Sequence, residues 1–372
     1  MLFTNALVFT PGGFVKGGFT VENGLFTEVF ADDRTGGADL KGARVIPGLV
    51  DVHIHGAAGA DFSDGDPEGL RRMAALLARR GITAFLPTSM TLPYETLERA
   101  FDTAAAFVKE SPAGCAEVLG IHMEGPFFSE KKKGAQNGAY LKLPDFEAFA
   151  KLQEGCGGLV RLVDVAPELE GAAAFTEQAS RLATVSVAHT DADYEAAKAV
   201  YEAGATHLTH LFNAMPPIHH RSPAVIGAAA ERQDVFAELI CDGYHIHPSA
   251  VRMAFRLFPG RICLISDALR CCGMPEGEYE LGGQPIRLKD GVARLSDGTI
   301  AGAASDLLTD LQNAIAFGIP ETEAVLAATL NPARSVRADE RLGSIEAGKQ
   351  ADFIICDESL NPGAVYIKGE RI

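Results

Sequence analysis

The sequence predicts an α/β protein, a (β/α)8 barrel of the TIM type with a small β-sandwich domain formed by both chain termini. Three observations support this prediction. Apolar runs alternate with helical patterns between residues 45 and 268, both ends of the chain are rich in strand patterns, and polar residues follow the apolar runs where strands should end. Strand–helix alternation implies a parallel sheet, and eight such units over this length fit a closed barrel better than an open sheet.

Eight apolar runs are expected as the buried barrel strands. They are VIPGLVDVHIHG, ITAFLPTSM, AEVLGIHMEGPF, LVRLVDVAP, TVSVAHT, THLTHLFNAM, VFAELICDGYHI and RICLISDA. The helical patterns between them include PEGLRRMAALLARRG, YETLERAFDTAAAFVKE, FTEQASRLA and DADYEAAKAVYEAG, and helices return at 304–317 and 321–330. No G-x-G-x-x-G motif follows the first strand, which weakens the alternative of a dinucleotide-binding sheet.

The two chain ends have a different pattern from the middle. Residues 1–46 and 335–372 show alternation and glycine-rich turns, as in LFTNALVFTP and RLGSIEAGKQADFIICD, and we expect them to form the small β domain together. The barrel is then expected over 47–334. Within it, GEYELGGQPIRLKDGVARLSDGT interrupts the strand–helix order, so a β-hairpin excursion is expected near 277–299.

The composition excludes some classes of partner. The chain of 372 residues has a net charge of −16, which argues against nucleic acid or an anionic membrane, although a few local groups can still bind an anionic small molecule. The sequence has no apolar stretch of membrane-spanning length and no signal-peptide pattern. The seven cysteines are scattered without a CxxC pair, which is typical of reduced thiols in a cytoplasmic protein.

The sharpest chemical signal is the segment Asp51-Val52-His53-Ile54-His55-Gly56 at the end of the first strand. Residues i and i+2 of a strand face the same side, so the two histidines can point into the barrel together and share one metal. A pair of ordinary histidines is the alternative for this motif alone. The position favours the metal, because barrel active sites lie at the carboxyl ends of the strands.

Other metal-binding residue types occur at the same point of other strands: Glu124 ends GIHMEGPF, His189 ends VSVAHT, His210 ends HLTHLF and Asp267 ends CLISDA. Buried polar groups need partners, and a shared metal supplies one. Separate hydrogen-bonded residues at loop starts are the alternative. Histidine and carboxylate ligands suit one or two divalent ions, with Zn²⁺ expected and Fe²⁺ as the alternative. Such a metal lowers the pKa of a bound water. Asp267 is suited to accept the proton of that water and deliver it to the leaving group. The alternative is that Asp267 is a plain metal ligand or a cap.

These residues resemble the amidohydrolase superfamily and, within it, the N-acetylglucosamine-6-phosphate deacetylases. The resemblance covers nearly the whole chain, from PGLVDVHIHG through HMEGPF, KKKGAQN, AHTDADY, THLFNAM, HHRSPAVIG, DGYHIHP and LISDA to GSIEAGKQADFII. HMEGPF, KKGAQN and THLFNAM match the deacetylases in particular, whereas HxH and the terminal GxI..GK.AD pattern belong to the wider superfamily.

The resemblance implies a role for each matched position. Glu124, His189 and His210 correspond to the principal metal site, His53 and His55 to a second site whose occupancy is open, and Asp267 to the catalytic acid/base. On the substrate side, the backbone N–H groups of Asn213 and Ala214 correspond to phosphate ligands, together with His245 and with Arg221, which is donated across a homodimer interface. Gln136 stands where some members have a histidine that contacts the acetamide, and Ile300, Ala301, Gly302 and Ala303 correspond to the loop at the acetyl end, where Ala303 replaces the usual serine.

The implied reaction is hydrolysis of the acetamide of N-acetyl-D-glucosamine 6-phosphate to D-glucosamine 6-phosphate and acetate. Three alternatives stay open at this point. One is a deacetylase of another amino-sugar phosphate, such as the galactosamine epimer. Another is a cyclic-amide hydrolase, a group that typically carries a carboxylated lysine where Glu124 stands. The last is a sugar-phosphate sensor without activity, which predicts missing metal ligands.

Overall fold

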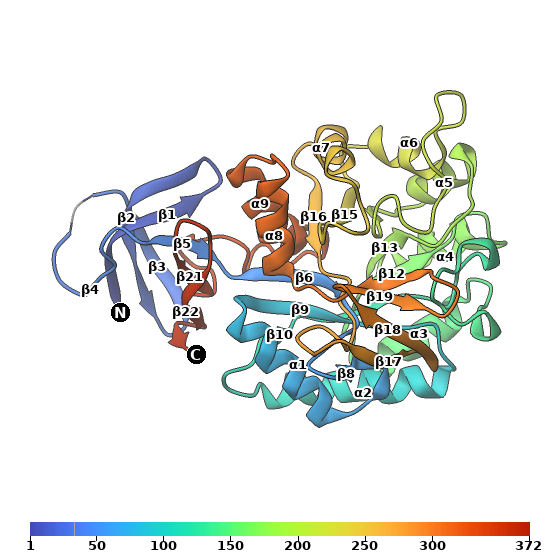
Figure 1. Cartoon of the computed structure of the whole chain (residues 1–372), viewed down its shortest axis with the longest axis horizontal. Coiled ribbons are helices and arrows are strands. Elements are labelled where there is room, and N and C mark those ends of the chain that lie inside the picture. The colour runs from blue at the N-terminus through green and yellow to red at the C-terminus, as the bar shows by residue number, and fades with distance from the viewer. Residues whose placement is uncertain (33) are drawn as a thin grey trace.

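The computed structural model describes residues 1–32 and 34–372, and its larger body is an α/β barrel (Figure 1). The parallel strands pair in the order β10-β9-β11-β12-β13-β14-β15-β16, and β6 pairs with β9. Between β16 and β6, Ile54 and Ala268 form a parallel bridge, and the Asp267 N–H donates to the His53 carbonyl at 2.9 Å. The predicted barrel is therefore confirmed. The strands are β6 (Leu49–Ile54), β9 (Ile82–Ser89), β10 (Glu117–Val118), β11 (Ile121–Met123), β12 (Val160–Val165), β13 (Thr184–Val187), β14 (His207–Leu208), β15 (Phe236–Ile240) and β16 (Ile262–Ile265).

Helices cover the outside of the barrel, and side-chain caps define where several of them begin. The α1 helix starts with Pro67 behind Asp66, whose carboxylate accepts from the Glu68 N–H, and Asp145, Asp193 and Asp306 cap α3, α5 and α8 in the same way. The patterns predicted α1, α2, α4, α5, α8 and α9. The helices are α1 (Pro67–Arg79), α2 (Tyr94–Glu110), α3 (Phe146–Gly155), α4 (Ala172–Ala179), α5 (Tyr194–Glu202), α6 (Ala224–Ala230), α7 (Pro248–Leu257), α8 (Leu307–Ala316), α9 (Glu321–Ala328) and α10 (Leu330–Ser335), with 3-10 turns η1 (Phe62–Asp64), η2 (Glu130–Lys132) and η3 (Gly138–Tyr140).

Strands from both chain ends form a second sheet, at the left of Figure 1, where both termini lie. Its order is β23-β22-β21-β5-β1-β2-β3, with β4 beside β1, and Ile354 pairs with Ile46. Phe353 packs against Phe19 with ring centroids 4.9 Å apart. The exact domain boundaries stay a prediction. The strands are β1 (Leu2–Thr10), β2 (Gly13–Glu22), β3 (Leu25–Phe30), β4 (Ala38–Asp39), β5 (Arg44–Pro47), β21 (Phe353–Cys356), β22 (Pro362–Ile367) and β23 (Glu370–Arg371).

An antiparallel sheet follows the last barrel strand in the region where an excursion was predicted, and it continues to Ala303. It consists of β17 (Gly277–Leu281), β18 (Gln284–Lys289), β19 (Val292–Leu295) and β20 (Ile300–Ala303), and a small β7 (Gly56–Ala57) and β8 (Ala60–Asp61) pair lies after β6. Ala303 donates its N–H to the Asp267 carbonyl at 2.9 Å, and Leu269 donates to the Ala303 carbonyl at 2.9 Å. These bonds fix the excursion to the end of β16.

Within residues 1–32 and 34–372, no helix combines the length and the apolar character that crossing a membrane requires. All seven cysteines are buried free thiols.

Candidate metal centre

The predicted ligands lie at the carboxyl end of the barrel strands. Glu124 directly follows β11, and His189, His210 and Asp267 each stand two residues beyond β13, β14 and β16. The latter three have φ values of 43°, 28° and 48°. This left-handed region costs a residue other than glycine roughly 1 kcal/mol, and it bends the chain sharply as it leaves each strand. The strand ends therefore bring together residues that are far apart in the sequence.

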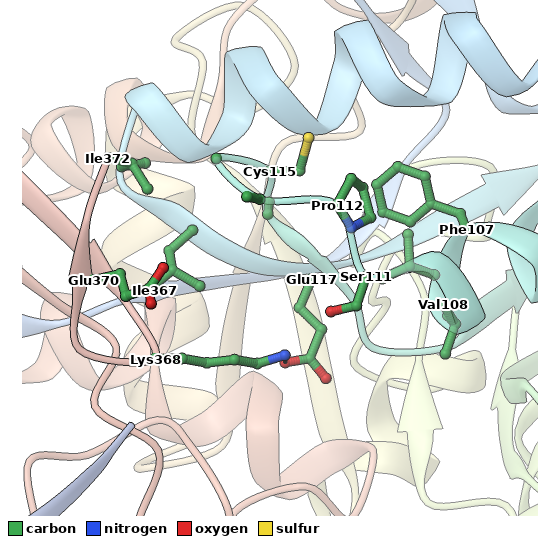
Figure 2. A pocket seen from close by; sticks show the side chains of 14 residues that line it. Phe107, Val108, Ser111, Pro112, Cys115, Glu117, Ile367, Lys368, Glu370 and Ile372 are labelled. Carbon is green, nitrogen blue, oxygen red and sulfur yellow. Dashed lines mark ion pairs between the residues drawn. The ribbon is translucent and has the colours of Figure 1, made fainter. Parts of the chain in front are cut away.

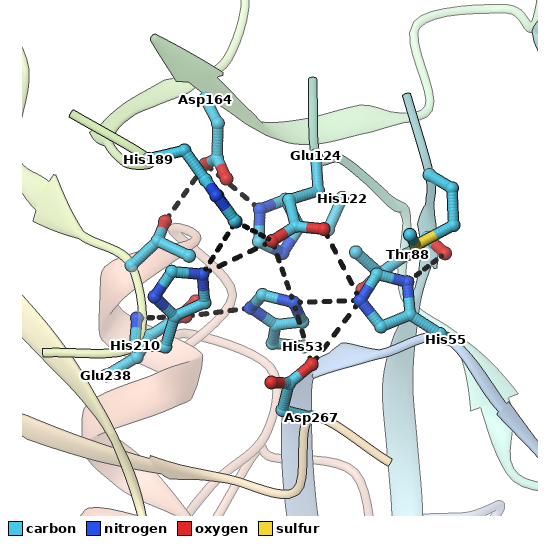
Figure 3. A network of polar contacts seen from close by, with 12 residues as sticks. His53, His55, Thr88, His122, Glu124, Asp164, His189, His210, Glu238 and Asp267 are labelled. Carbon is cyan, nitrogen blue, oxygen red and sulfur yellow. Dashed lines mark hydrogen bonds and ion pairs between the residues drawn. The ribbon is translucent and has the colours of Figure 1, made fainter. Parts of the chain in front are cut away.

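Glu124, His189 and His210 form a compact group of possible ligands (Figure 3). Glu124 Oε1 lies 3.1 Å from His189 Nε2 and 3.3 Å from His210 Nε2, and the two nitrogens are 3.1 Å apart. Tetrahedral ligands about 2.0 Å from a Zn²⁺ ion lie about 3.3 Å from one another. The three side chains are buried. Both the donor types and their separations therefore fit a divalent metal.

His53 and His55 form the second group together with Glu124. Their Nε2 atoms are 3.4 Å apart, and His55 Nε2 lies 3.4 Å from Glu124 Oε2. Asp267 Oδ1 lies 3.3 Å from His55 Nε2 and 3.5 Å from His53 Nε2. In Figure 3, Glu124 lies between His55 and the pair His189–His210. The carboxylate of Glu124 thus faces both groups, and Asp267 lies beside the second.

Hydrogen bonds hold three of these histidines in a metal-binding orientation. His189 Nδ1 lies 2.8 Å from the Lys132 carbonyl, and His55 Nδ1 lies 3.2 Å from the Thr88 carbonyl. A carbonyl can only accept, so each Nδ1 carries a proton and Nε2 is the nitrogen that can offer its lone pair to a metal. His53 Nδ1 lies 2.9 Å from a carboxylate oxygen of Glu238.

The pKa values of His55, His210 and Asp267 shift in the direction set by neighbouring charged side chains, which together outweigh the effect of burial. Burial lowers the pKa of His55, but Asp267 and Glu124 outweigh it and raise that pKa to about 9. Burial also opposes the charge on His210, yet Glu124 raises its pKa to about 9. Burial disfavours the ionised form of Asp267, but the charge of His53 and the hydrogen bond from His55 hold its pKa below the usual range. At neutral pH, Asp267 is therefore ionised and able to accept a proton.

We expect metal binding to strengthen as the pH rises, because the pKa values of His55 and His210 are raised to about 9 in the metal-free protein. Affinity for Zn²⁺ should increase about tenfold per pH unit for each proton that the metal displaces. Protonation of these two histidines also stabilises the metal-free fold. This stabilisation is fully present below the unfolded-state histidine pKa of about 6.5, and it is lost as the pH rises through about 9. Zinc titration and thermal unfolding of the metal-free protein across this range measure both effects; a pH-independent affinity would contradict the prediction.

The metal cluster opens into a cavity of about 200 Å³. Asp242 Oδ2 lies 2.7 Å from His245 Nδ1 and orients that ring at the cavity wall. The cavity wall contains most of the predicted substrate residues: Gln136, Asn213, Ala214, His245, Ile300, Ala301 and Gly302.

Two of the predicted substrate residues have contacts that the sequence did not suggest. Asn213 donates its backbone N–H to the His210 carbonyl at 2.9 Å, whereas no described residue accepts from the N–H of Ala214. Gln136 donates its side-chain amide to Glu124 Oε2 at 2.5 Å. Its amide oxygen accepts from the Thr91 N–H at 2.7 Å. In this structure Gln136 therefore orients a candidate metal ligand.

Two predicted substrate residues do not line this cavity, and neither does the predicted metal ligand His53. Ala303 is buried, and its backbone N–H donates to the Asp267 carbonyl at 2.9 Å. Arg221 is exposed on the segment before α6, where its guanidinium lies 2.7 Å from His220 Nε2. The cavity wall also contains residues that were not predicted, Met90, Gly134, Ala135 and Thr299. Of these, Gly134 and Ala135 lie within the matched KKKGAQN segment, which was the available signal.

A separate cavity of about 290 Å³ lies between the end of α2 and the C-terminal strands (Figure 2). Phe107, Cys115, Ile367 and Ile372 contribute its apolar wall, and Lys368 Nζ lies 3.9 Å from Glu117 Oε2. Its wall contains none of the grouped metal-binding residues found among the described residues. The metal-lined cavity is therefore the better candidate for catalysis.

Known proteins resemble this chain over nearly its whole length. The amidohydrolase family model matches residues 44–372. The N-acetylglucosamine-6-phosphate deacetylase of Vibrio furnissii is 35% identical, with 94% of this chain and 89% of the relative covered, and that of Bacillus subtilis is 38% identical over 84% and 80%. The N-acetylgalactosamine-6-phosphate deacetylase of Escherichia coli O157:H7 is 34% identical over 87% and 86%. A mutant Mycobacterium smegmatis N-acetyl-D-glucosamine-6-phosphate deacetylase, solved with N-acetyl-D-glucosamine 6-phosphate, superposes with a TM-score of 0.94 at 33% identity, over 100% and 98% of the two chains.

Proposed function

Because this chain belongs to the amidohydrolase family and, within it, to the N-acetylglucosamine-6-phosphate deacetylases, we propose that it hydrolyses N-acetyl-D-glucosamine 6-phosphate to D-glucosamine 6-phosphate and acetate. The observation that carries this proposal is the cluster of Glu124, His189 and His210, whose ligand atoms lie 3.1–3.3 Å apart at the mouth of the barrel. Asp267 lies at the same cavity. A cyclic-amide hydrolase is less well supported, because Glu124 stands where that group typically carries a carboxylated lysine.

Each residue of the cluster has a role in the proposed mechanism. Glu124, His189 and His210 would hold the principal divalent metal, and His53 and His55 a second one, with Zn²⁺ favoured over Fe²⁺ for these donors. When bound, the metal supplies Lewis acidity that lowers the pKa of the attacking water and stabilises negative charge on the acetamide oxygen. The Asp267 carboxylate accepts the proton from the water and delivers it to the amine nitrogen as the C–N bond breaks.

The phosphate is proposed to bind at the His245 side of the cavity, with the N–H of Ala214 and the neighbouring Asn213. We further propose a homodimer in which Arg221 completes this phosphate site in the neighbouring subunit. The support is that Arg221 is exposed and does not line the cavity of its own chain. A cytoplasmic location is proposed from the seven unpaired thiols.

Acetate release from a panel of substrates tests the proposed function. The panel contains N-acetylglucosamine 6-phosphate, its galactosamine epimer and unphosphorylated N-acetylglucosamine. Dihydroorotate, whose hydrolysis releases no acetate, is assayed separately by the formation of its ring-opened product, and the metal content of the enzyme is measured in parallel. We expect the glucosamine phosphate to be hydrolysed fastest and the unphosphorylated sugar poorly. Faster hydrolysis of the epimer would reassign the substrate, and hydrolysis of dihydroorotate alone would reject the deacetylase.

Removing the Arg221 side chain is expected to raise KM by roughly 10–100-fold with little change in kcat, because a charge-assisted phosphate contact is lost. Steady-state kinetics measure this, and Arg181→Ala, which removes an exposed arginine that lies just beyond α4 and pairs with Glu177, is the matched control. Mixing Arg221→Ala subunits with Asp267→Asn subunits should restore activity if Arg221 acts on the neighbouring site. Verified heterodimers without any rescue would contradict the shared site.

A further inference from the structure

A buried carboxylate lies inside the barrel beneath the metal cluster. Glu238 stands on β15 within the otherwise apolar run VFAELIC, and its side chain is fully buried. It accepts three hydrogen bonds: Oε2 lies 2.9 Å from His53 Nδ1 and 3.0 Å from the backbone N of His210, and Oε1 lies 3.1 Å from His207 Nε2. An ionised carboxyl in such a place is costly unless these donors satisfy it.

The contacts of Glu238 connect two of the three groups of possible metal ligands, and the third consists of Glu238 itself with His53 and His122. His53 belongs to the second group and His210 to the principal one. Its bond to His53 takes the proton on Nδ1, so that Nε2 is the nitrogen directed at Glu124 and Asp267, at 3.7 and 3.5 Å. In His55 and His189, a backbone carbonyl accepts the hydrogen bond from Nδ1 in place of a carboxylate. Among the described histidines of the two groups, His53 is thus the one oriented by a carboxylate, which also makes an imidazole a stronger ligand.

A neighbouring carboxylate offers a natural comparison. Asp164 is equally buried and accepts from His122 Nε2 at 3.0 Å and from Thr209 Oγ1 at 3.0 Å. The other nitrogen of His122 lies 3.1 Å from the Val52 carbonyl. Both nitrogens of His122 are therefore occupied, although its ring packs 4.5 Å from that of His53. In Figure 3, Asp164 lies next to His122, whereas Glu238 lies next to His210. Asp164 thus supports a histidine that is not available to a metal.

We propose that Glu238 is a positioning residue that fixes His53 with Nε2 available for the second metal and, through the backbone of His210, ties that site to the principal one. The proposal rests on the proposed metal centre, since it concerns the ligands of that same site. It assigns Glu238 no contact with substrate. Glu238 is therefore expected to affect metal binding only by orienting His53.

Zinc titration of the metal-free full-length protein tests the proposal, with Zn²⁺ alone as the probe. We expect the wild type to bind two equivalents and Glu238→Gln to bind the second one about 10–100-fold more weakly, with the first much less affected. The matched control Asp164→Asn should bind both as the wild type does. A wild-type second affinity in Glu238→Gln, an equal loss of both equivalents, or the same loss in Asp164→Asn would overturn the proposal.

Two further measurements separate a positioning role from a structural one. In a His53→Ala background, Glu238→Gln should cause no further loss of zinc affinity, and an additional loss would overturn the proposal. If Glu238→Gln fails to fold, the two-bond ¹⁵N–¹H spectrum of the metal-free wild type decides, because His53 should carry its proton on Nδ1 and a proton on Nε2 alone would refute the role. A wild type that binds one Zn²⁺ yet releases acetate overturns this proposal while the proposed function stands.

Discussion

Asp267→Asn is expected to lower kcat by roughly 10²–10⁴-fold, the usual contribution of general acid–base catalysis. Asparagine keeps the shape of the side chain and the backbone bond from Asp267 to the His53 carbonyl at 2.9 Å. It cannot accept a proton from water or deliver one to the amine. Metal content and KM should change little, because Glu124, His189 and His210 remain. Steady-state kinetics together with metal analysis check the prediction.

The exposed Asp290→Asn variant is the matched control for this experiment, since it makes the same chemical change outside the cavity. Activity of Asp267→Asn within about tenfold of the wild type would refute the proton-transfer role. Loss of metal in parallel with activity would instead assign Asp267 as a metal ligand, the alternative that its distances of 3.3 and 3.5 Å from His55 and His53 keep open.

Glu124→Gln should have a comparably large effect through loss of metal. Its two carboxylate oxygens face both groups, with Oε1 3.1 Å from His189 Nε2 and Oε2 3.4 Å from His55 Nε2. Changing a residue that only supports a ligand already costs about 10–100-fold, so removing the charge of a ligand itself should lower metal affinity by at least about 100-fold. Activity should fall with occupancy, and excess Zn²⁺ should restore part of it.

Metal analysis after dialysis and zinc-dependent kinetics measure this prediction. Glu98→Gln, on the outer surface of α2, is the matched control, because its carboxylate pairs only with the Lys151 ammonium at 2.8 Å among the contacts described. A Glu124→Gln enzyme that keeps wild-type metal content would show that the histidines alone hold the ion.

The barrel was predictable because its strands are apolar runs of the right length, but the extent of pairing was not. The run THLTHLFNAM suggested a long strand, whereas β14 comprises only His207–Leu208. The chain turns away at His210 and Phe212, whose φ values are 28° and 79°. Helix α6 was missed because AVIGAAA has no polar positions that would reveal a helical period.

The grouping of the candidate metal ligands was predictable for a simple reason: each is a polar residue at the end of an apolar run. Contacts between side chains from different strands were not, because they depend on which neighbours face one another inside the barrel. Glu238 was visible in VFAELIC as one charge in an apolar strand, but nothing in the sequence identified His53 as its partner. The bond from Gln136 to Glu124 was hidden in the same way.

The left-handed backbone at His189, His210 and Asp267 has a consequence for protein engineering. Glycine would relax each of these positions, so a screen that selects only for thermal tolerance would favour replacing them. Each such replacement would delete a side chain of the metal cluster. Heat-resistant variants chosen without an activity assay are therefore expected to accumulate inactive enzymes, and these three codons should be held fixed in any stabilisation library.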